Sequence, residues 1–134
     1  MSHDPLALIH EAEVAGKYAY APYSEYKVGA CVVDNQGNTY TGCNIENASY
    51  GSSMCAERVA IFKMVSDGGE VLNAIAVVTE DGGPPCGNCL QVMREFCKDS
   101  SQLRIYLSSA NRAIKEFTLK DLLPIEFSLD PERK

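Results

Sequence analysis

Two apolar runs of strand length constrain the fold most strongly, because each is too continuous to belong to a surface strand. Residues 27–33 read KVGACVV and residues 71–78 read VLNAIAVV. A strand with one solvated face alternates apolar and polar residues, whereas a nearly continuous apolar run indicates burial on both faces. Both runs therefore predict strands within a sheet that helices cover on each side.

Helical patterns separate these runs. Asp4 followed by Pro5 is typical of an N-cap and first helical position, and apolar residues then recur at helical spacing as far as Ala19. A second helix is predicted from about Cys55 to Ser66, and a third begins near Gly87. The side chains expected to face inward from the second helix are Val59, Ile61, Phe62, Met64 and Val65.

The remaining segments complete the predicted order of elements. The turn DNQG at 34–37 predicts that residues 38–43 return as the second strand of a hairpin. Short strands are expected at 103–107 and 114–118, followed by a short helix that is capped by Thr118 and Asp121 and stopped by Pro124. The sequence thus predicts an α/β fold of three layers, α/β/α, around a mixed sheet of about five strands, with residues 1–134 as a single domain.

Charge and hydropathy exclude several classes of function. The net charge is −6 and basic residues do not cluster, which argues against a polynucleotide partner and favours a small neutral one. No apolar run approaches the ~20 residues of a membrane span. The N-terminus lacks the features of a signal peptide, so we expect a cytoplasmic protein whose thiols stay reduced.

Three of the six cysteines are placed where helices begin. Cys86 and Cys89 lie in GPPCGNCLQ at the start of the third helix, and Cys55 opens the second. Such thiols could form a redox pair, be buried, or converge as thiolates on zinc, which with three protein ligands keeps a fourth position open for catalysis. For Cys31, Cys43 and Cys97 we expect plain burial, and His3 and His10 are expected to be exposed.

Glu57 follows Cys55 by two residues, in the first turn of the second helix. From there its carboxylate could reach the open position of a zinc site and move protons, without being a ligand itself. The alternative reading is a side chain that only complements the helix dipole. For Arg58 the corresponding alternative is a solvated helix residue.

The fragments CAE and PCGNC together resemble the zinc deaminase signature, His-x-Glu followed by Pro-Cys-x-x-Cys, with Cys55 in the place of the histidine. With cysteine there, the chain is similar to the small homotetrameric cytidine deaminases. The fragments that carry this resemblance, in the family's order and spacing, are YAPYSEYKVGA, GCNIENASYG, CAERVAIFK, PCGNCLQVMREF and LLPIEF. The resemblance implies deamination of cytidine and 2′-deoxycytidine to uridine and 2′-deoxyuridine with release of ammonia, as in pyrimidine salvage.

The resemblance also implies a role for individual residues. It makes Cys55, Cys86 and Cys89 the ligands of one zinc ion per chain, Glu57 the proton shuttle, and Arg58 a hydrogen-bond donor that offsets thiolate charge. Asn44 and Glu46 would bind the ribose 3′-hydroxyl, and Tyr26 would line the base pocket. Active sites would be shared within the homotetramer: from neighbouring subunits, Ala48 and Tyr50 would approach the 5′-hydroxyl and Phe127 would stack on the base.

Two positions depart from the family's pattern. Leu90 stands where the family usually has arginine after the second cysteine pair, which places the tuning of the metal site in question. Tyr26 stands where the family usually has phenylalanine, and its hydroxyl needs a partner if it is buried. Two other functions stay open: deamination of a cytosine-containing antibiotic such as blasticidin S, and a non-catalytic zinc module for protein interaction.

Overall fold

The computed structural model describes residues 3–109 and 113–129. At its centre lies a five-stranded sheet with the order β2-β1-β3-β4-β5. Strand β1 pairs antiparallel with β2 and β3, β3 pairs parallel with β4, and β4 pairs antiparallel with β5, which confirms a mixed sheet. The strands are β1 (Gly29–Asp34), β2 (Thr39–Cys43), β3 (Leu72–Val78), β4 (Arg104–Ser108) and β5 (Ile114–Thr118).

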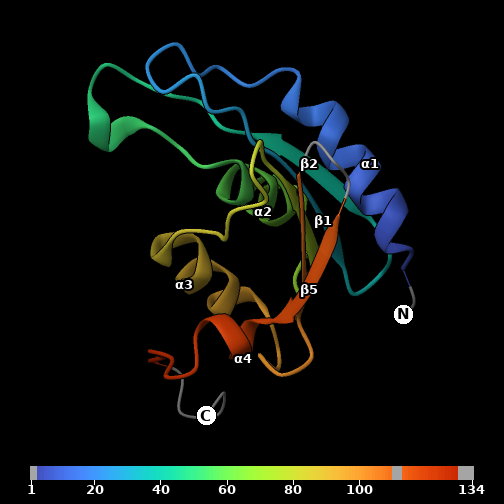
Figure 1. The fold of residues 1–134 in the computed structure, drawn as a ribbon. Coiled ribbons are helices and arrows are strands. Elements are labelled where there is room, and N and C mark those ends of the chain that lie inside the picture. Colours follow the sequence, from blue (N-terminus) through green and yellow to red (C-terminus); the bar gives the residue numbers. More distant parts are fainter. Residues whose placement is uncertain (1–2, 110–112, 130–134) are drawn as a thin grey trace.

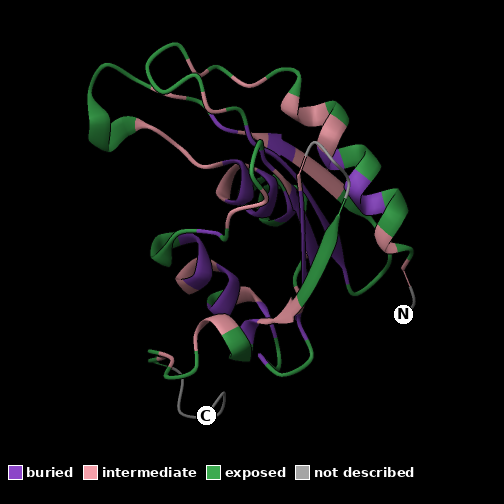
Figure 2. Cartoon of the chain, in the orientation of Figure 1, coloured by how far each residue is buried: buried purple, intermediate pink, exposed green. Residues whose placement is uncertain are grey.

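Helices cover both faces of this sheet, as predicted. Helix α1 (Pro5–Gly16) lies on one face, and α2 (Ala56–Ser66) and α3 (Gly87–Phe96) lie on the other (Figure 1). The short α4 (Leu119–Leu122) follows β5, and a 3-10 turn spans Tyr50–Ser52. Each face has its own apolar core, one beneath α1 and one beneath α2 and α3, so the buried strands lie between two cores (Figure 2). None of the helices in the described ranges is long and apolar enough to span a membrane.

Local chemistry explains where these elements begin and how closely they pack. Asp4 caps α1 by accepting a hydrogen bond from the Leu6 amide at 3.1 Å, with Pro5 at the first helical position. Thr118 and Asp121 form a reciprocal capping box at α4. Gly42 lets α2 approach the sheet, since a Cβ there would lie 2.6 Å from the Ala60 nitrogen.

The structure corrects several predictions of detail. Helix α1 ends at Gly16, short of Ala19. In α2, Phe62 and Val65 are 42% and 38% exposed rather than inward-facing, because the buried stripe runs through Ala56, Ala60, Ile61 and Met64. Phe62 directly follows Ile61, and Val65 directly follows Met64. Successive residues of an α-helix project about 100° apart, so Phe62 and Val65 face away from the buried stripe.

Two predictions about single side chains were also wrong. His3 is half-buried rather than exposed, with its Nε2 2.8 Å from the Tyr106 hydroxyl of β4, whereas His10 is exposed as predicted. Cys43 is only half-buried because β2 is an edge strand, whereas Cys31 and Cys97 are buried as expected.

Candidate active site

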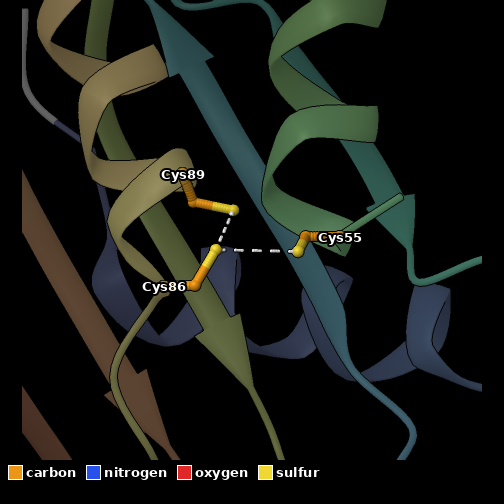
Figure 3. Close-up of side chains that lie close together, drawn as sticks. All are labelled: Cys55, Cys86 and Cys89. Carbon is orange, nitrogen blue, oxygen red and sulfur yellow. Dashed lines mark hydrogen bonds between the residues drawn. The ribbon is translucent and has the colours of Figure 1, made fainter. Parts of the chain in front are cut away.

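Three thiols converge where α2 and α3 begin. Cys55 is the N-cap of α2, Cys86 is the N-cap of α3, and Cys89 lies in the first turn of α3. Their side chains point toward one another across the gap between the two helices (Figure 3). The predicted convergence is therefore confirmed, and it follows from the sheet, which aligns the starts of both helices on one face.

The spacing of the sulfurs fits a zinc ion and does not fit a disulfide. The Cys55 sulfur lies 3.8 Å from that of Cys86, which lies 3.5 Å from that of Cys89, and all three are within 4.8 Å of one another. Tetrahedral zinc with Zn–S bonds of about 2.3 Å separates its sulfurs by about 3.8 Å. A disulfide bond needs about 2.05 Å, and all six cysteines are free thiols. The donor set thus suits one zinc ion per chain.

The surroundings of Cys55 favour its thiolate. A hydrogen bond from the Cys89 thiol, helped by Arg58, lowers the pKa of Cys55 to about 5 although burial opposes this. Nη2 of Arg58 lies 3.2 Å from the Cys55 sulfur, so this arginine is not the freely solvated residue of the alternative reading. The amino-terminal ends of α2 and α3 add positive potential at the same place.

Glu57 lies in the first turn of α2 and its side chain is buried. Burial raises the pKa of Glu57 to about 7. A carboxyl group with a pKa near 7 can both accept and release a proton at neutral pH, as a general acid–base catalyst requires. A carboxylate that only complemented a helix dipole would be stabilised in its charged form, which lowers the pKa. The burial and raised pKa of Glu57 therefore favour the proton-transfer reading.

A cavity of about 520 Å³ opens in front of Glu57 and two of the thiols. It brings together most of the predicted site residues, although they come from distant parts of the chain. The predicted residues in its lining are Tyr26, Asn44, Glu46, Tyr50, Cys55, Glu57, Arg58 and Cys86. Cys89 is buried and does not line the cavity. Ala48 and Phe127 do not line this cavity within the described chain.

The predicted ribose-binding pair is held in place by backbone groups. The Asn44 amide accepts from the Val28 nitrogen at 2.9 Å and donates to the Tyr26 carbonyl at 2.7 Å. Glu46 accepts from the amides of Tyr23 and Ser24 at 3.0 and 3.1 Å, and also from the Ser24 hydroxyl. The hydrogen bond from Ser24 lowers the pKa of Glu46, so this carboxylate is charged at neutral pH.

Phe127 lies on the extended segment after α4, with 65% of its surface exposed. Its carbonyl accepts a hydrogen bond from Nε2 of Gln91 on α3 at 2.9 Å. The preceding residue, Glu126, pairs with Arg94 of the same helix. The segment is therefore anchored to the helix that carries two thiols, while its aromatic ring points away from its own core.

The two departures from the family's pattern have different structural roles. Leu90 is buried in the apolar core beneath α2 and α3, so it is a packing residue. The Tyr26 hydroxyl has a partner, since it donates to Oδ1 of Asp81 at 2.6 Å.

The sequence did not identify three residues that support the site: Asp81, Ser24 and Arg94. The one signal available in the sequence was that the Tyr26 hydroxyl would need an acceptor if it were buried.

The comparisons with known proteins agree with this geometry. Residues 2–103 match the family model described as the cytidine and deoxycytidylate deaminase zinc-binding region. The chain is 47% identical to a cytidine deaminase of Sporosarcina psychrophila, over 90% of this chain and 89% of that protein. It is 45% identical to one of Halalkalibacterium halodurans, with 95% and 96% covered.

Solved structures show the same likeness. The crystal structure of cytidine deaminase from Burkholderia pseudomallei superposes with a TM-score of 0.85 and 46% identity, over 95% of this chain and all of that one. A cytidine deaminase structure from Mycobacterium tuberculosis gives a TM-score of 0.82 at 39% identity, with 96% of this chain and 100% of that chain covered. With its three converging thiols and buried glutamate, the chain belongs to the cytidine and deoxycytidylate deaminase family.

Proposed function

We propose that this chain hydrolyses cytidine and 2′-deoxycytidine to uridine and 2′-deoxyuridine, with release of ammonia. The observation that carries the proposal is the position of Glu57, a buried carboxyl with a raised pKa that shares a cavity with the thiols of Cys55 and Cys86. A non-catalytic zinc module has no need of a buried proton carrier beside its metal.

The chemistry divides between the metal and the chain. Zinc held by Cys55, Cys86 and Cys89 would lower the pKa of a water molecule toward neutrality. Glu57 accepts a proton from the attacking water and passes it to N3 of the base as the C4–O bond forms and the C4=N3 double bond becomes a single bond. It then moves the proton of the new C4 hydroxyl to the exocyclic nitrogen as the C4–N bond breaks, which leaves the C4 carbonyl of uridine and releases ammonia. One carboxyl group thus acts as base and then as acid, which a pKa of about 7 permits. The hydrogen bond from Arg58 offsets part of the thiolate charge.

The cavity supports a free nucleoside as the substrate. Its volume of about 520 Å³ suits a small ligand, and the charged Glu46 carboxylate and the Asn44 amide could both engage the ribose 3′-hydroxyl. Tyr26 would lie against the base. The net charge of −6 disfavours a polynucleotide. A role in pyrimidine salvage in the cytoplasm follows from this substrate and agrees with the free thiols.

We further propose a homotetramer, built from a single domain per chain, whose active sites are completed by neighbouring subunits. Tyr50 is 91% exposed and Phe127 is 65% exposed, so both aromatic rings are available for contact with a neighbouring subunit. Ala48 would then approach the 5′-hydroxyl of a neighbour's substrate, and Phe127 would stack on its base. Tyr50 would approach the same 5′-hydroxyl, although in the isolated chain it lines the cavity of its own subunit.

Steady-state assays of purified protein on cytidine, 2′-deoxycytidine, cytidine monophosphate and blasticidin S test the proposal. We expect turnover of the two nucleosides and little of the other two compounds. Turnover confined to blasticidin S would identify an antibiotic deaminase instead. Zinc-replete protein that deaminates none of the four would leave the interaction module as the better reading.

A further inference from the structure

The hydroxyl of Tyr26, a residue that lines the cavity, binds the loop that leads to the zinc ligands Cys86 and Cys89. It donates to Oδ1 of Asp81 at 2.6 Å, joining residues 55 apart in sequence. Tyr26 precedes β1, whereas Asp81 lies in the loop between β3 and α3. Tyr26 is bonded to the predicted ribose-binding residues, whereas the loop with Asp81 leads to the zinc ligand Cys86. This hydrogen bond therefore connects the ribose-binding region with the metal-binding region.

On the loop side, residues 82–85 join Asp81 to the zinc ligand Cys86, and hydrogen bonds and two prolines restrain this segment. The Asp81 oxygen also accepts from the Gly83 amide at 3.0 Å, and the Thr79 hydroxyl oxygen accepts from the amides of Gly82 and Gly83 at 2.7 and 3.1 Å. Only Pro84 and Pro85 separate Gly83 from Cys86. Because the two proline rings fix φ at both positions, this short segment has fewer rotatable bonds with which to absorb a displacement of Gly83 before Cys86.

On the other side, the backbone of Tyr26 is bonded to both predicted ribose-binding residues. Its carbonyl accepts from Nδ2 of Asn44 at 2.7 Å. Its amide donates to the Ser24 hydroxyl oxygen at 3.0 Å, and that hydroxyl in turn donates to Glu46. A continuous hydrogen-bonded path therefore runs from Asn44 and Glu46 through Tyr26 to Asp81.

We infer that Tyr26 is a positioning residue that couples the ribose-binding corner of the cavity to the loop that orients the zinc ligands. The inference rests on the proposed function and deepens it. Binding of the 3′-hydroxyl to Asn44 and Glu46 fixes Tyr26, and the Tyr26 hydroxyl then fixes the loop before Cys86. Binding energy from a part of the substrate that does not react is thereby used for orientation at the reacting centre, where it raises kcat.

The variant Tyr26→Phe tests this coupling because it removes the hydroxyl and keeps the ring. Cytidine and 3′-deoxycytidine are the matched substrates, since only cytidine can engage the ribose corner fully. We expect kcat for cytidine to fall about fivefold, the size of effect expected for one net hydrogen bond, while kcat for 3′-deoxycytidine changes little. The ratio of the two kcat values therefore falls, whereas a general loss of structure would lower both.

Two further variants make the test specific. Tyr26→Phe should have no additional effect on kcat in an Asp81→Ala background if the two side chains act through one contact. Tyr40→Phe is the matched control, because the Tyr40 hydroxyl also donates to an aspartate, Oδ2 of Asp34 at 3.2 Å, outside the cavity. This control should leave the ratio of kcat values unchanged.

Amide hydrogen exchange gives a readout that does not depend on activity. In Tyr26→Phe we expect faster exchange at Gly82 and Gly83, with the melting temperature and zinc content near those of the wild type. Unchanged exchange at these glycines, or equal losses of kcat on both substrates, would overturn the coupling. A wild-type protein that does not deaminate cytidine would refute the proposed function instead, and exchange would still decide whether Tyr26 holds the loop.

Discussion

Nε of Arg94 lies 2.5 Å from Oε1 of Glu126, and the arginine side chain is only 3% exposed. The pair fastens the segment after α4 to the helix that carries Cys86 and Cys89. It lies beside the hydrogen bond from Gln91 to the Phe127 carbonyl. The position of the Phe127 ring therefore depends on a buried ion pair as well as on the backbone.

Glu126→Gln should destabilise the protein by about 3 kcal/mol, because it removes the carboxylate charge that pairs with the buried Arg94 guanidinium. Thermal or denaturant unfolding measures the change, with zinc content checked in both proteins. Glu116→Gln is the control: the pair of Glu116 with Arg104 is 3.7 Å long and exposed, with side-chain exposures of 52% and 43%, so its loss should cost less than about 1 kcal/mol. Equal stability of the Glu126 variant and the wild type would show that the pair does not anchor the segment.

Mixing two impaired variants tests whether Phe127 acts across a subunit interface. Glu57→Gln lacks the proton shuttle and Phe127→Ala lacks the stacking ring. After subunit exchange, hybrid oligomers contain sites with an intact Glu57 and a neighbour's Phe127, so activity should exceed the sum of the separate proteins. Exchange can be verified by mass spectrometry of labelled subunits. No gain after verified exchange, or a monomer at working concentration, would rule out shared sites.

Arg58→Gln should weaken zinc binding by about 10- to 100-fold, the range typical for outer partners of metal ligands. The physical reason is the loss of the donor that lies 3.2 Å from the Cys55 sulfur. Competition with a chromophoric chelator measures the affinity. Lys63→Gln removes a positive charge from the exposed side of the same helix and should leave the affinity unchanged. If both variants bind zinc equally well, the role proposed for Arg58 is wrong.

Leu90→Arg tests whether the departure at this position reflects packing or charge. Because Leu90 is 8% exposed within the core, a guanidinium there should lower stability by about 2 kcal/mol or more. Leu90→Met keeps the volume and should cost less than about 1.5 kcal/mol. The measurement is the denaturant midpoint of both variants. An arginine variant as stable as the wild type, with an acidic limb of the pH–activity profile moved to lower pH, would instead indicate a missing compensating charge.

The sequence was sufficient for the parts of the fold that depend on local pattern. The apolar runs of β1 and β3 revealed a covered sheet, and the residues Asp4, Thr118 and Asp121 marked helix starts through capping chemistry that is visible in sequence. The convergence of Cys55 with Cys86 also followed, because helix starts on one face of a sheet lie together.

Other features depend on contacts between distant residues, which no local pattern encodes. Arg94 and Glu126 are both common surface residue types, and only packing buries their pair. Asp81 gains its role from a tyrosine 55 positions away. The exposure of Phe62 was missed because a run of apolar residues on a short helix does not show which side the sheet will cover.

The most direct test of zinc-dependent deamination with Glu57 as the proton carrier is the turnover of cytidine by Glu57→Gln at full zinc occupancy. The amide keeps the shape of the side chain but cannot exchange a proton with water or with the departing amine. Ammonia release and metal content should be measured on the same samples of variant and wild type. We predict at least a ~10²-fold lower kcat with one zinc per chain retained; near-normal turnover in the zinc-replete variant would contradict the account.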